Sequence, residues 1–188
     1  MIKKYTIVGI DEAGRGPLAG PVVAASVSID EKYLPVGIND SKKISLKNRE
    51  IFYEQILKKS ENYGIGVIDS KTIDKINIHE ATLLAMEKSY QKINYKNCKV
   101  YIDGIFKPEI RGKLCTIKHG DRLVPIVSAA SIIAKVTRDR IMLEIDKEFP
   151  MYDFKKHKGY PTKYHIEMIK KYGICKYHRK TFKPIKYL

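Results

Sequence analysis

The chain has 188 residues, 44% of them hydrophobic, which suits one domain with a full core and leaves no space for a second catalytic domain. Its formal net charge of +15 is typical of a protein with a polyanionic partner such as nucleic acid, and residues 151–188 hold eleven Lys or Arg against two acids. No apolar run approaches the roughly 20 residues that cross a bilayer, the start of the chain does not resemble a signal peptide, and the three cysteines lie far apart, so we expect a cytoplasmic protein without membrane contact, disulfides or a cysteine zinc site.

Alternating strand and helix patterns run through the chain. β-Branched and apolar runs predict strands at about 5–10, 20–29, 62–68, 98–103 and, more weakly, 114–118. Apolar residues at helical spacing predict helices at 46–59, 78–93 and 125–147, with a short helix after the turn at 157–161. This order predicts an α/β layer fold, with a catalytic core over residues 1–150 and a small basic helical extension over 151–188 packed on it as one folding unit.

Acidic residues stand at the ends of the predicted core elements. Asp11 and Glu12 end the first strand, Asp103 ends the strand at 98–103, and Asp121 precedes the long helix. Singly, each has an ordinary explanation as a turn residue, or for Asp121 as a helix cap worth about 1 kcal/mol. Together, four carboxylates would need a counter-charge, and hard oxygen ligands suit Mg²⁺ or Mn²⁺. Two such ions about 4 Å apart would orient a water and stabilise the leaving 3′ oxygen, so the pattern indicates phosphodiester hydrolysis.

Six motifs, in order over nearly the whole chain, resemble those of bacterial ribonuclease HII. They are GIDEAGRGP at 9–17, NDSKK at 39–43, YIDG at 101–104, KHGD at 118–121, SAASIIAKV at 128–136 and HKGYPT at 157–162. The resemblance implies a ribonuclease H-like mixed β-sheet flanked by helices. It also implies an endonuclease that hydrolyses the RNA strand of RNA/DNA hybrids and incises 5′ to ribonucleotides embedded in duplex DNA, leaving 5′-phosphate and 3′-hydroxyl ends.

The same resemblance assigns the four acids a shared role. Asp11, Glu12, Asp103 and Asp121 would be the family's catalytic quartet, which binds two Mn²⁺ or Mg²⁺ ions during catalysis. Asp11 suits a bridging ligand from the central strand. Asp121, held by a loop before the long helix, would be the more mobile ligand.

Substrate recognition is implied for a second set of residues. Gly14, Arg15 and Gly16 would hydrogen-bond the ribose 2′-hydroxyl through backbone groups, and Tyr160 would stack near the sugar of the following deoxynucleotide. Together they would recognise the junction between a ribonucleotide and a deoxyribonucleotide. The loop residues that the resemblance places on backbone phosphates are Asn39, Lys42 and Lys43.

For several residues the sequence is consistent with two roles, one functional and one structural. Ser131 and Lys135, one turn apart on the long helix, fit the substrate groove and a plain helix surface equally well. His119 adjoins the motif acid Asp121 but is ordinarily a structural or surface histidine. The segment 176–182 interleaves basic and aromatic residues, a pattern suited to a duplex backbone and also to a solvated helix end.

Rival functions are a junction resolvase, ribonuclease HIII, and a nucleic-acid-binding module without catalysis. The glycine-flanked Arg15 argues against a resolvase, and a first strand that starts by residue 5 leaves no space for the N-terminal domain usual in ribonuclease HIII. The presence of all four acids argues against a silent module. Recruitment by a replication clamp is left open, and a monomer is the simplest expectation.

Overall fold

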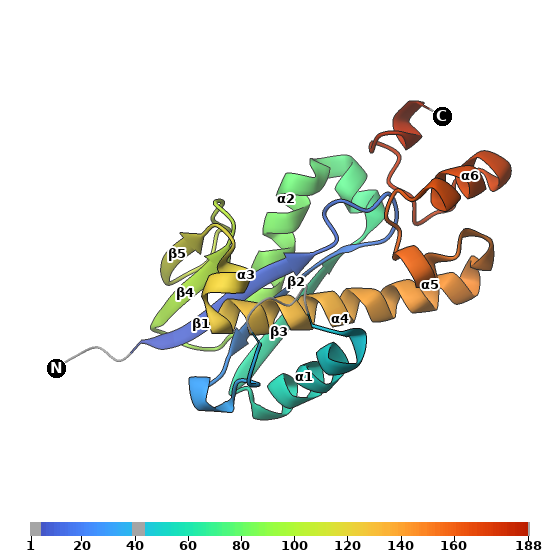
Figure 1. The fold of residues 1–188 in the computed structure, drawn as a ribbon. Helices are drawn as coiled ribbons and strands as arrows, with labels where there is room; N and C mark the ends of the chain where they lie inside the picture. Colours follow the sequence, from blue (N-terminus) through green and yellow to red (C-terminus); the bar gives the residue numbers. More distant parts are fainter. Residues whose placement is uncertain (1–4, 39–43, 188) are drawn as a thin grey trace.

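The protein is described by a computed structural model that covers residues 5–38 and 44–187. Its centre is a five-stranded mixed sheet in the order β3-β2-β1-β4-β5, with helices on both faces (Figure 1). The predicted phosphate-contact residues Asn39, Lys42 and Lys43 lie outside the described residues. The predicted α/β sheet flanked by helices is confirmed.

The strands match the predicted segments closely, and the first is longer than expected. They are β1 (Thr6–Ala13), β2 (Val22–Ser28), β3 (Asn62–Ile68), β4 (Cys98–Asp103) and β5 (Lys113–Ile117). β1 runs antiparallel to β2 and parallel to β4. Pairing with β4 ends at Ile10, whereas pairing with β2 continues to Ala13. The end of β1 therefore extends beyond its neighbour, and Asp11 and Glu12 lie within the strand.

The helices are α1 (Leu46–Lys59), α2 (Ser70–Tyr90), α3 (Gly120–Leu123), α4 (Pro125–Glu148), α5 (Phe154–His157) and α6 (Lys163–Tyr172). Short 3-10 turns lie at Glu31–Tyr33, Pro150–Tyr152 and Ile185–Tyr187. α2 starts eight residues before the predicted 78. It is kinked at Asn77, whose φ is 66°. The Asn77 side chain caps the second part by accepting the N–H groups of His79 and Glu80 at 2.8 and 3.2 Å. The kink interrupts the apolar periodicity, so the pattern indicated only the second part.

Each face of the sheet is covered by its own helices. α2 packs on one face against Val8 and Ile10 of β1, and α1 with α4 covers the other face. Gly9 lets α4 approach closely, since a Cβ at this position would lie 2.2 Å from the carbonyl oxygen of Ile126. The long helix is thereby set directly against the strand that carries Asp11.

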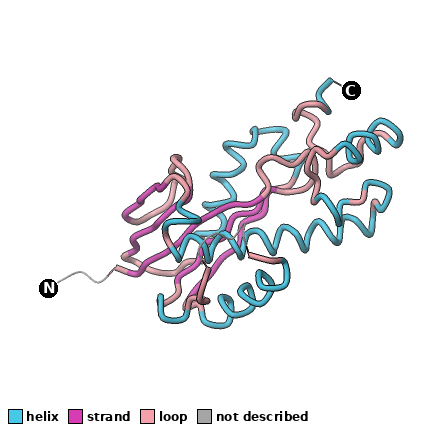
Figure 2. Tube along the Cα trace, viewed as in Figure 1, coloured by secondary structure: helices cyan, strands magenta, loops and turns pink. Residues whose placement is uncertain are grey.

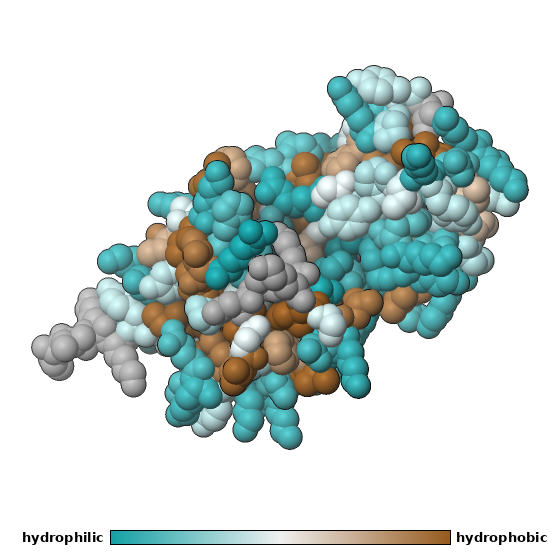
Figure 3. All heavy atoms as spheres, viewed as in Figure 1, coloured by the Kyte–Doolittle hydropathy of each residue, from teal (hydrophilic) through white to brown (hydrophobic). Residues whose placement is uncertain are grey.

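The C-terminal extension packs on the core through its own apolar cluster. Tyr152, Phe154 and Ile169 join Leu18 and Met142 in this cluster, beside the far end of α4. Loops after β1 and after α6 meet there, where Ala19 bridges to His178 (Figure 2). On the face drawn in Figure 3, hydrophilic side chains predominate over the end of the molecule that holds the extension. None of the described helices combines the length and hydropathy needed to cross a membrane.

Candidate active site

The acids of β1 and β4 lie together where these strands end. Asp11 is 4% exposed and faces α4, where Ser131 hydrogen-bonds its carboxylate. Burial, with repulsion from Glu12 and Asp103, raises the pKa of Asp11 well above its usual value, and the Ser131 hydroxyl partly opposes this. Burial also raises the pKa of Glu12, against the effect of Arg15, whose guanidinium lies 3.5 Å from the Glu12 carboxylate. The three carboxylates therefore share one electrostatic environment.

Asp103 and Asp121 are linked through the start of α3. One Asp103 oxygen accepts the N–H of Gly120 at 2.7 Å, which places Asp121, the next residue, beside the end of β4. The expectation that a loop holds Asp121 is wrong: it lies in the first turn of α3 and is 3% exposed. The Ser128 hydroxyl donates to the Asp121 carbonyl at 2.6 Å and ties α3 to α4. A short helix braced in this way removes the structural reason for expecting a mobile ligand.

The carboxylates stand near one another without forming a closed ligand cage. A cavity of about 330 Å³ is lined by both Glu12 and Asp103, so the ends of β1 and β4 open into one space. Among the described residues, which include all four acids, no group of three or more His, Cys, Asp or Glu side chains is arranged to hold a metal ion as it stands.

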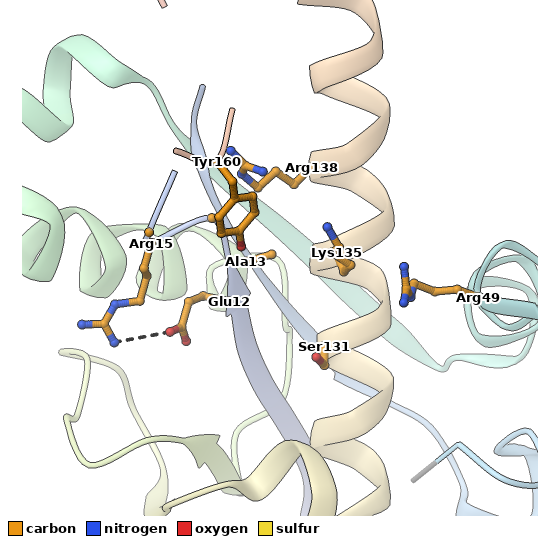
Figure 4. A pocket seen from close by; sticks show the side chains of 10 residues that line it. Glu12, Ala13, Arg15, Arg49, Ser131, Lys135, Arg138 and Tyr160 are labelled. Carbon is orange, nitrogen blue, oxygen red and sulfur yellow. Dashed lines mark hydrogen bonds and ion pairs between the residues drawn. The ribbon is translucent and has the colours of Figure 1, made fainter. Parts of the chain in front are cut away.

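A second cavity, of about 320 Å³, joins the 14–16 loop to Tyr160 (Figure 4). Its lining residues are Glu12, Ala13, Gly14, Arg15, Gly16, Arg49, Ser131, Lys135, Arg138 and Tyr160. The Tyr160 ring faces the loop, since a Cβ on Gly16 would lie 3.7 Å from its Cε1 atom. Tyr160 is 42% exposed, so its ring is open to a ligand. The structure thus brings Glu12 and all four of the predicted sugar-recognition residues that it describes into one cavity.

Cationic side chains surround this cavity. Lys135 lies at its wall and forms an ion pair with Asp139 at 2.6 Å, and burial lowers the pKa of Lys135. Ser131, Lys135 and Arg138 lie on one face of α4 and line the cavity, and a role of Ser131 and Lys135 in substrate binding stays a prediction. Arg49 reaches the cavity from α1. Positive charge on several sides suits the phosphate backbone of a nucleic acid.

Three arginines of this region were not predicted from the sequence. Arg49 and Arg138 line the cavity, and Arg179 is fully buried behind the 14–16 loop. For Arg138 a signal was available, since it lies three residues after Lys135 and therefore on the same helix face. Arg179 belongs to a basic segment whose charges look alike in sequence, so no local pattern distinguishes it.

The segment 176–182 combines buried and exposed residues, and contact of its exposed residues with a duplex stays a prediction. Lys176 and Tyr177 contact Glu148 at 2.6 and 2.9 Å, whereas His178 and Arg179 are buried. These contacts attach the end of the chain to the core. The side chains of His178 and Arg179 are buried and cannot contact a duplex. His119 is exposed and precedes α3 in a left-handed conformation, φ 62°, and its side chain does not cap the helix.

Comparisons with known proteins follow the same pattern. A family model described as Ribonuclease HII matches residues 8–185. A ribonuclease HII of Coxiella burnetii is 47% identical over 97% of this chain and 90% of its own length. The crystal structure of ribonuclease H2 from Pyrococcus horikoshii superposes with a TM-score of 0.76 at 28% identity, covering 97% of this chain and 96% of that one. The ribonuclease HII in a PCNA complex from Archaeoglobus fulgidus gives 0.80 at 26% identity, with 95% of each chain covered.

These matches extend over nearly the whole chain and agree with the six motifs and with the sheet order. They also decide between the rival functions. The Coxiella burnetii relative is named ribonuclease HII, and the match covers 90% of its length. The chain has a ribonuclease H-like fold and belongs to the ribonuclease HII family, as an endonuclease that acts on the RNA strand of RNA/DNA hybrids.

Proposed function

We propose that this enzyme incises duplex DNA on the 5′ side of embedded ribonucleotides, as well as RNA/DNA hybrids, and leaves 5′-phosphate and 3′-hydroxyl ends. Asp11, Glu12, Asp103 and Asp121 are the proposed catalytic residues. The observation that carries this proposal is the shared cavity in which Glu12, the 14–16 loop and Tyr160 meet. The 14–16 loop, proposed to recognise the ribose, therefore lies within a few residues of Asp11 and Glu12, which are proposed to catalyse cleavage next to that ribose.

The acids suit two divalent cations, Mg²⁺ or Mn²⁺, as cofactors. All the proposed ligands are carboxylate oxygens, the donor type that such hard ions prefer. Burial and repulsion from Glu12 and Asp103 raise the pKa of Asp11, and a bound cation would oppose both effects. When bound, the ions would activate a water and stabilise the leaving 3′ oxygen.

The protein's own side chains hold these ligands in place. Ser131 orients the Asp11 carboxylate from α4, and the N–H of Gly120 orients that of Asp103. Arg15 holds Glu12 at the mouth of the cavity. These contacts restrain the carboxylates singly, which lowers the conformational entropy that each would lose when an ion binds.

Recognition of the junction is assigned to the 14–16 loop and Tyr160. Backbone N–H groups of the loop would bond the 2′-hydroxyl, which is absent from DNA, and the Tyr160 ring would pack on the next sugar. Lys135 and Arg49 would attract the adjoining phosphates. Tyr160 comes from the extension, so we propose that residues 151–188 complete the 1–150 core as one folding unit.

A nicking assay on a duplex with a single ribonucleotide tests the activity. With Mg²⁺ or Mn²⁺ the protein should nick this duplex and a long hybrid, and Asp11→Asn should abolish nicking while binding persists. Glu144→Gln is the matched control, because within the described part of the chain this exposed acid pairs only with Lys147. Equal cleavage of an all-DNA duplex would refute sugar recognition. Full activity of Asp103→Asn would refute the two-ion arrangement.

The proposal extends to the setting of the enzyme. We propose a cytoplasmic monomer that binds a replication clamp, a partner supported by the clamp complex of the Archaeoglobus relative. Light scattering on the purified protein, alone and mixed with a clamp, tests both the monomer and the partner. A titration of salt should weaken duplex binding steeply, because basic contacts with phosphates release counterions.

A further inference from the structure

Two arginines are buried behind the 14–16 loop, and burying a charge is costly unless it is hydrogen-bonded. Arg138 of α4 is 1% exposed, and Arg179 of the C-terminal segment is 0% exposed. Every hydrogen bond that either guanidinium donates within the described chain ends on a backbone carbonyl between residues 14 and 21. Both buried charges are thus committed to the connection that follows β1.

Of these two arginines, Arg179 is the one that hydrogen-bonds residues 14–16 within the described chain. Its Nη2 donates to the carbonyl of Gly14 at 2.6 Å, and its Nη1 donates to that of Arg15 at 2.9 Å. Nε and Nη2 also share the carbonyl of Gly20, at 3.0 and 2.9 Å. Arg138 instead binds the carbonyls of Ala19 and Pro21.

Arg179 is itself held firmly before any substrate arrives. Its backbone N–H donates to Leu18 at 2.8 Å, and the Phe182 ring lies 5.0 Å from its guanidinium carbon. Burial lowers the pKa of Arg179 to about 9, so the side chain still carries its charge at neutral pH. A planar, charged fork fixed in this way sets the direction of each carbonyl that it binds.

The direction of these carbonyls decides where the loop amides point. In a trans peptide the C=O and the following N–H point in opposite directions. With the carbonyls of Gly14 and Arg15 turned inward to Arg179, the N–H groups of Arg15 and Gly16 turn outward. Neither N–H donates a hydrogen bond to any described residue, and both residues line the cavity shared with Tyr160.

We propose that Arg179 is a positioning residue for sugar selectivity: it fixes the 14–16 loop from behind and aims the Arg15 and Gly16 amides at the ribose 2′-hydroxyl. This inference rests on the proposed function of the loop. Arg179 itself touches no substrate, since it is fully buried. Its contribution is to prevent the two peptide units from rotating away from the sugar.

The test variant is Arg179→Lys, which keeps the charge but lacks the fork that binds the carbonyls of Gly14, Arg15 and Gly20 together. Arg140→Lys is the matched control, because Arg140 makes its ion pairs with Glu50 and Glu54 on the exposed side of α4. The measurement is the Kd for an all-DNA duplex divided by the Kd for the same duplex with one ribonucleotide, in EDTA so that no cleavage occurs.

We expect wild type and Arg140→Lys to share a ratio well above one, and Arg179→Lys to lower it about tenfold, the effect of losing one to two oriented hydrogen bonds. Its Kd for all-DNA duplex should stay unchanged, which a general structural defect would not produce. Retention of the full ratio by Arg179→Lys overturns the inference alone. A wild-type ratio of one overturns the proposed function of the loop and the inference with it.

A measurement on the wild type covers the case in which Arg179→Lys does not fold. Amide hydrogen exchange, followed by NMR, should show Arg15 and Gly16 unprotected in the free protein and protected by the ribonucleotide duplex but not by all-DNA duplex. Protection of both amides in the free protein would mean that they point inward, which contradicts the role assigned to Arg179.

Discussion

Replacing Asp11 with Asn should stabilise the metal-free protein while abolishing its activity. The Asp11 carboxylate is 4% exposed and repelled by Glu12 and Asp103, and these effects raise its pKa well above the usual value. The neutral amide of Asn has nearly the same shape and removes both the burial of charge and the repulsion. Its oxygen can still accept the Glu12 N–H, which now reaches Asp11 at 2.7 Å, and the Ser131 hydroxyl.

The magnitude follows from what is kept and what is lost. Since both hydrogen bonds survive, the change removes mainly an unfavourable charge, and we expect a gain of about 1–2 kcal/mol in the free energy of unfolding, typical of a relaxed functional site. A raised folded-state pKa means that wild type loses stability as pH rises through that pKa. The advantage of Asp11→Asn should therefore vanish below about pH 4, where the wild-type carboxyl is protonated in both states, and grow as the pH rises from there toward the raised folded-state pKa.

Urea denaturation followed by circular dichroism measures this free energy in EDTA and in Mg²⁺. At a hundredfold excess over its Kd, Mg²⁺ should stabilise wild type by about 2.7 kcal/mol and Asp11→Asn much less, so the order of stability reverses. Glu144→Gln, at an exposed ion pair, should match wild type in both conditions. A variant less stable than wild type in EDTA at pH 7, or equal stabilisation of both proteins by Mg²⁺, would refute the reasoning.

Three other predictions concern the scaffold of the site. Gly9→Ala should cost about 1–3 kcal/mol in urea denaturation, because its Cβ would lie 2.2 Å from the carbonyl oxygen of Ile126 and push α4 from β1. Asp74→Ala should cost roughly 1–3 kcal/mol and speed proteolysis of the C-terminal segment, because three hydrogen bonds to residues 180 and 181 are lost. Burial lowers the pKa of His165 and of His178 from 6.5 to about 4. The free energy of unfolding should therefore be highest above pH 6.5. It should fall by roughly 3 kcal/mol for each histidine as the pH drops from 6.5 to about 4, because the unfolded chain binds these protons first.

Matched variants separate these effects from general damage. Gly16→Ala, whose Cβ would meet nothing closer than 3.7 Å, should leave the free energy of unfolding nearly unchanged, and a cost equal to that of Gly9→Ala would contradict the steric argument. Asp30→Ala removes an exposed acid remote from the C-terminal segment and should not alter its proteolysis. A stability profile that stays flat between pH 6.5 and 4 would contradict a neutral, buried histidine pair.

The local sequence pattern was sufficient to predict a helix or strand where the residues of that element determine its bounds. The predicted helix at 125–147 agrees with α4 (Pro125–Glu148), because its apolar stripe and its bounding prolines are all in the sequence. It failed for α2, where a kink at Asn77 breaks the periodicity. The placement of Asp121 in a buried turn of helix depends on contacts with β4 and α4, which no short window of sequence contains.

The site shows the same division between local and distant information. The motif acids and the glycine-flanked Arg15 can be predicted from the sequence, because the chemistry proposed for them needs those residue types. Arg179 could not, because counting charge assigns every lysine and arginine of the tail to the surface. Its burial becomes intelligible only when the loop carbonyls that accept its hydrogen bonds are seen to converge on it.

The C-terminal extension is an appendage in sequence but part of the site in space. His165 holds the Tyr160 carbonyl through Nδ1 at 2.9 Å, and its Nε2 meets Nε2 of His178 at 3.1 Å. The residue after His178 is Arg179, which binds the carbonyls of the 14–16 loop. A continuous buried chain of contacts thus joins the two elements proposed to read the junction. The Tyr160 carbonyl requires the proton of His165 on Nδ1, and the Cys175 N–H requires Nδ1 of His178 as its acceptor, so Nε2 of His178 donates to Nε2 of His165. A second proton on His165 would occupy the accepting Nε2 and break this bond. Acid should therefore disturb Tyr160 and the loop together, before the sheet that carries the acids is lost.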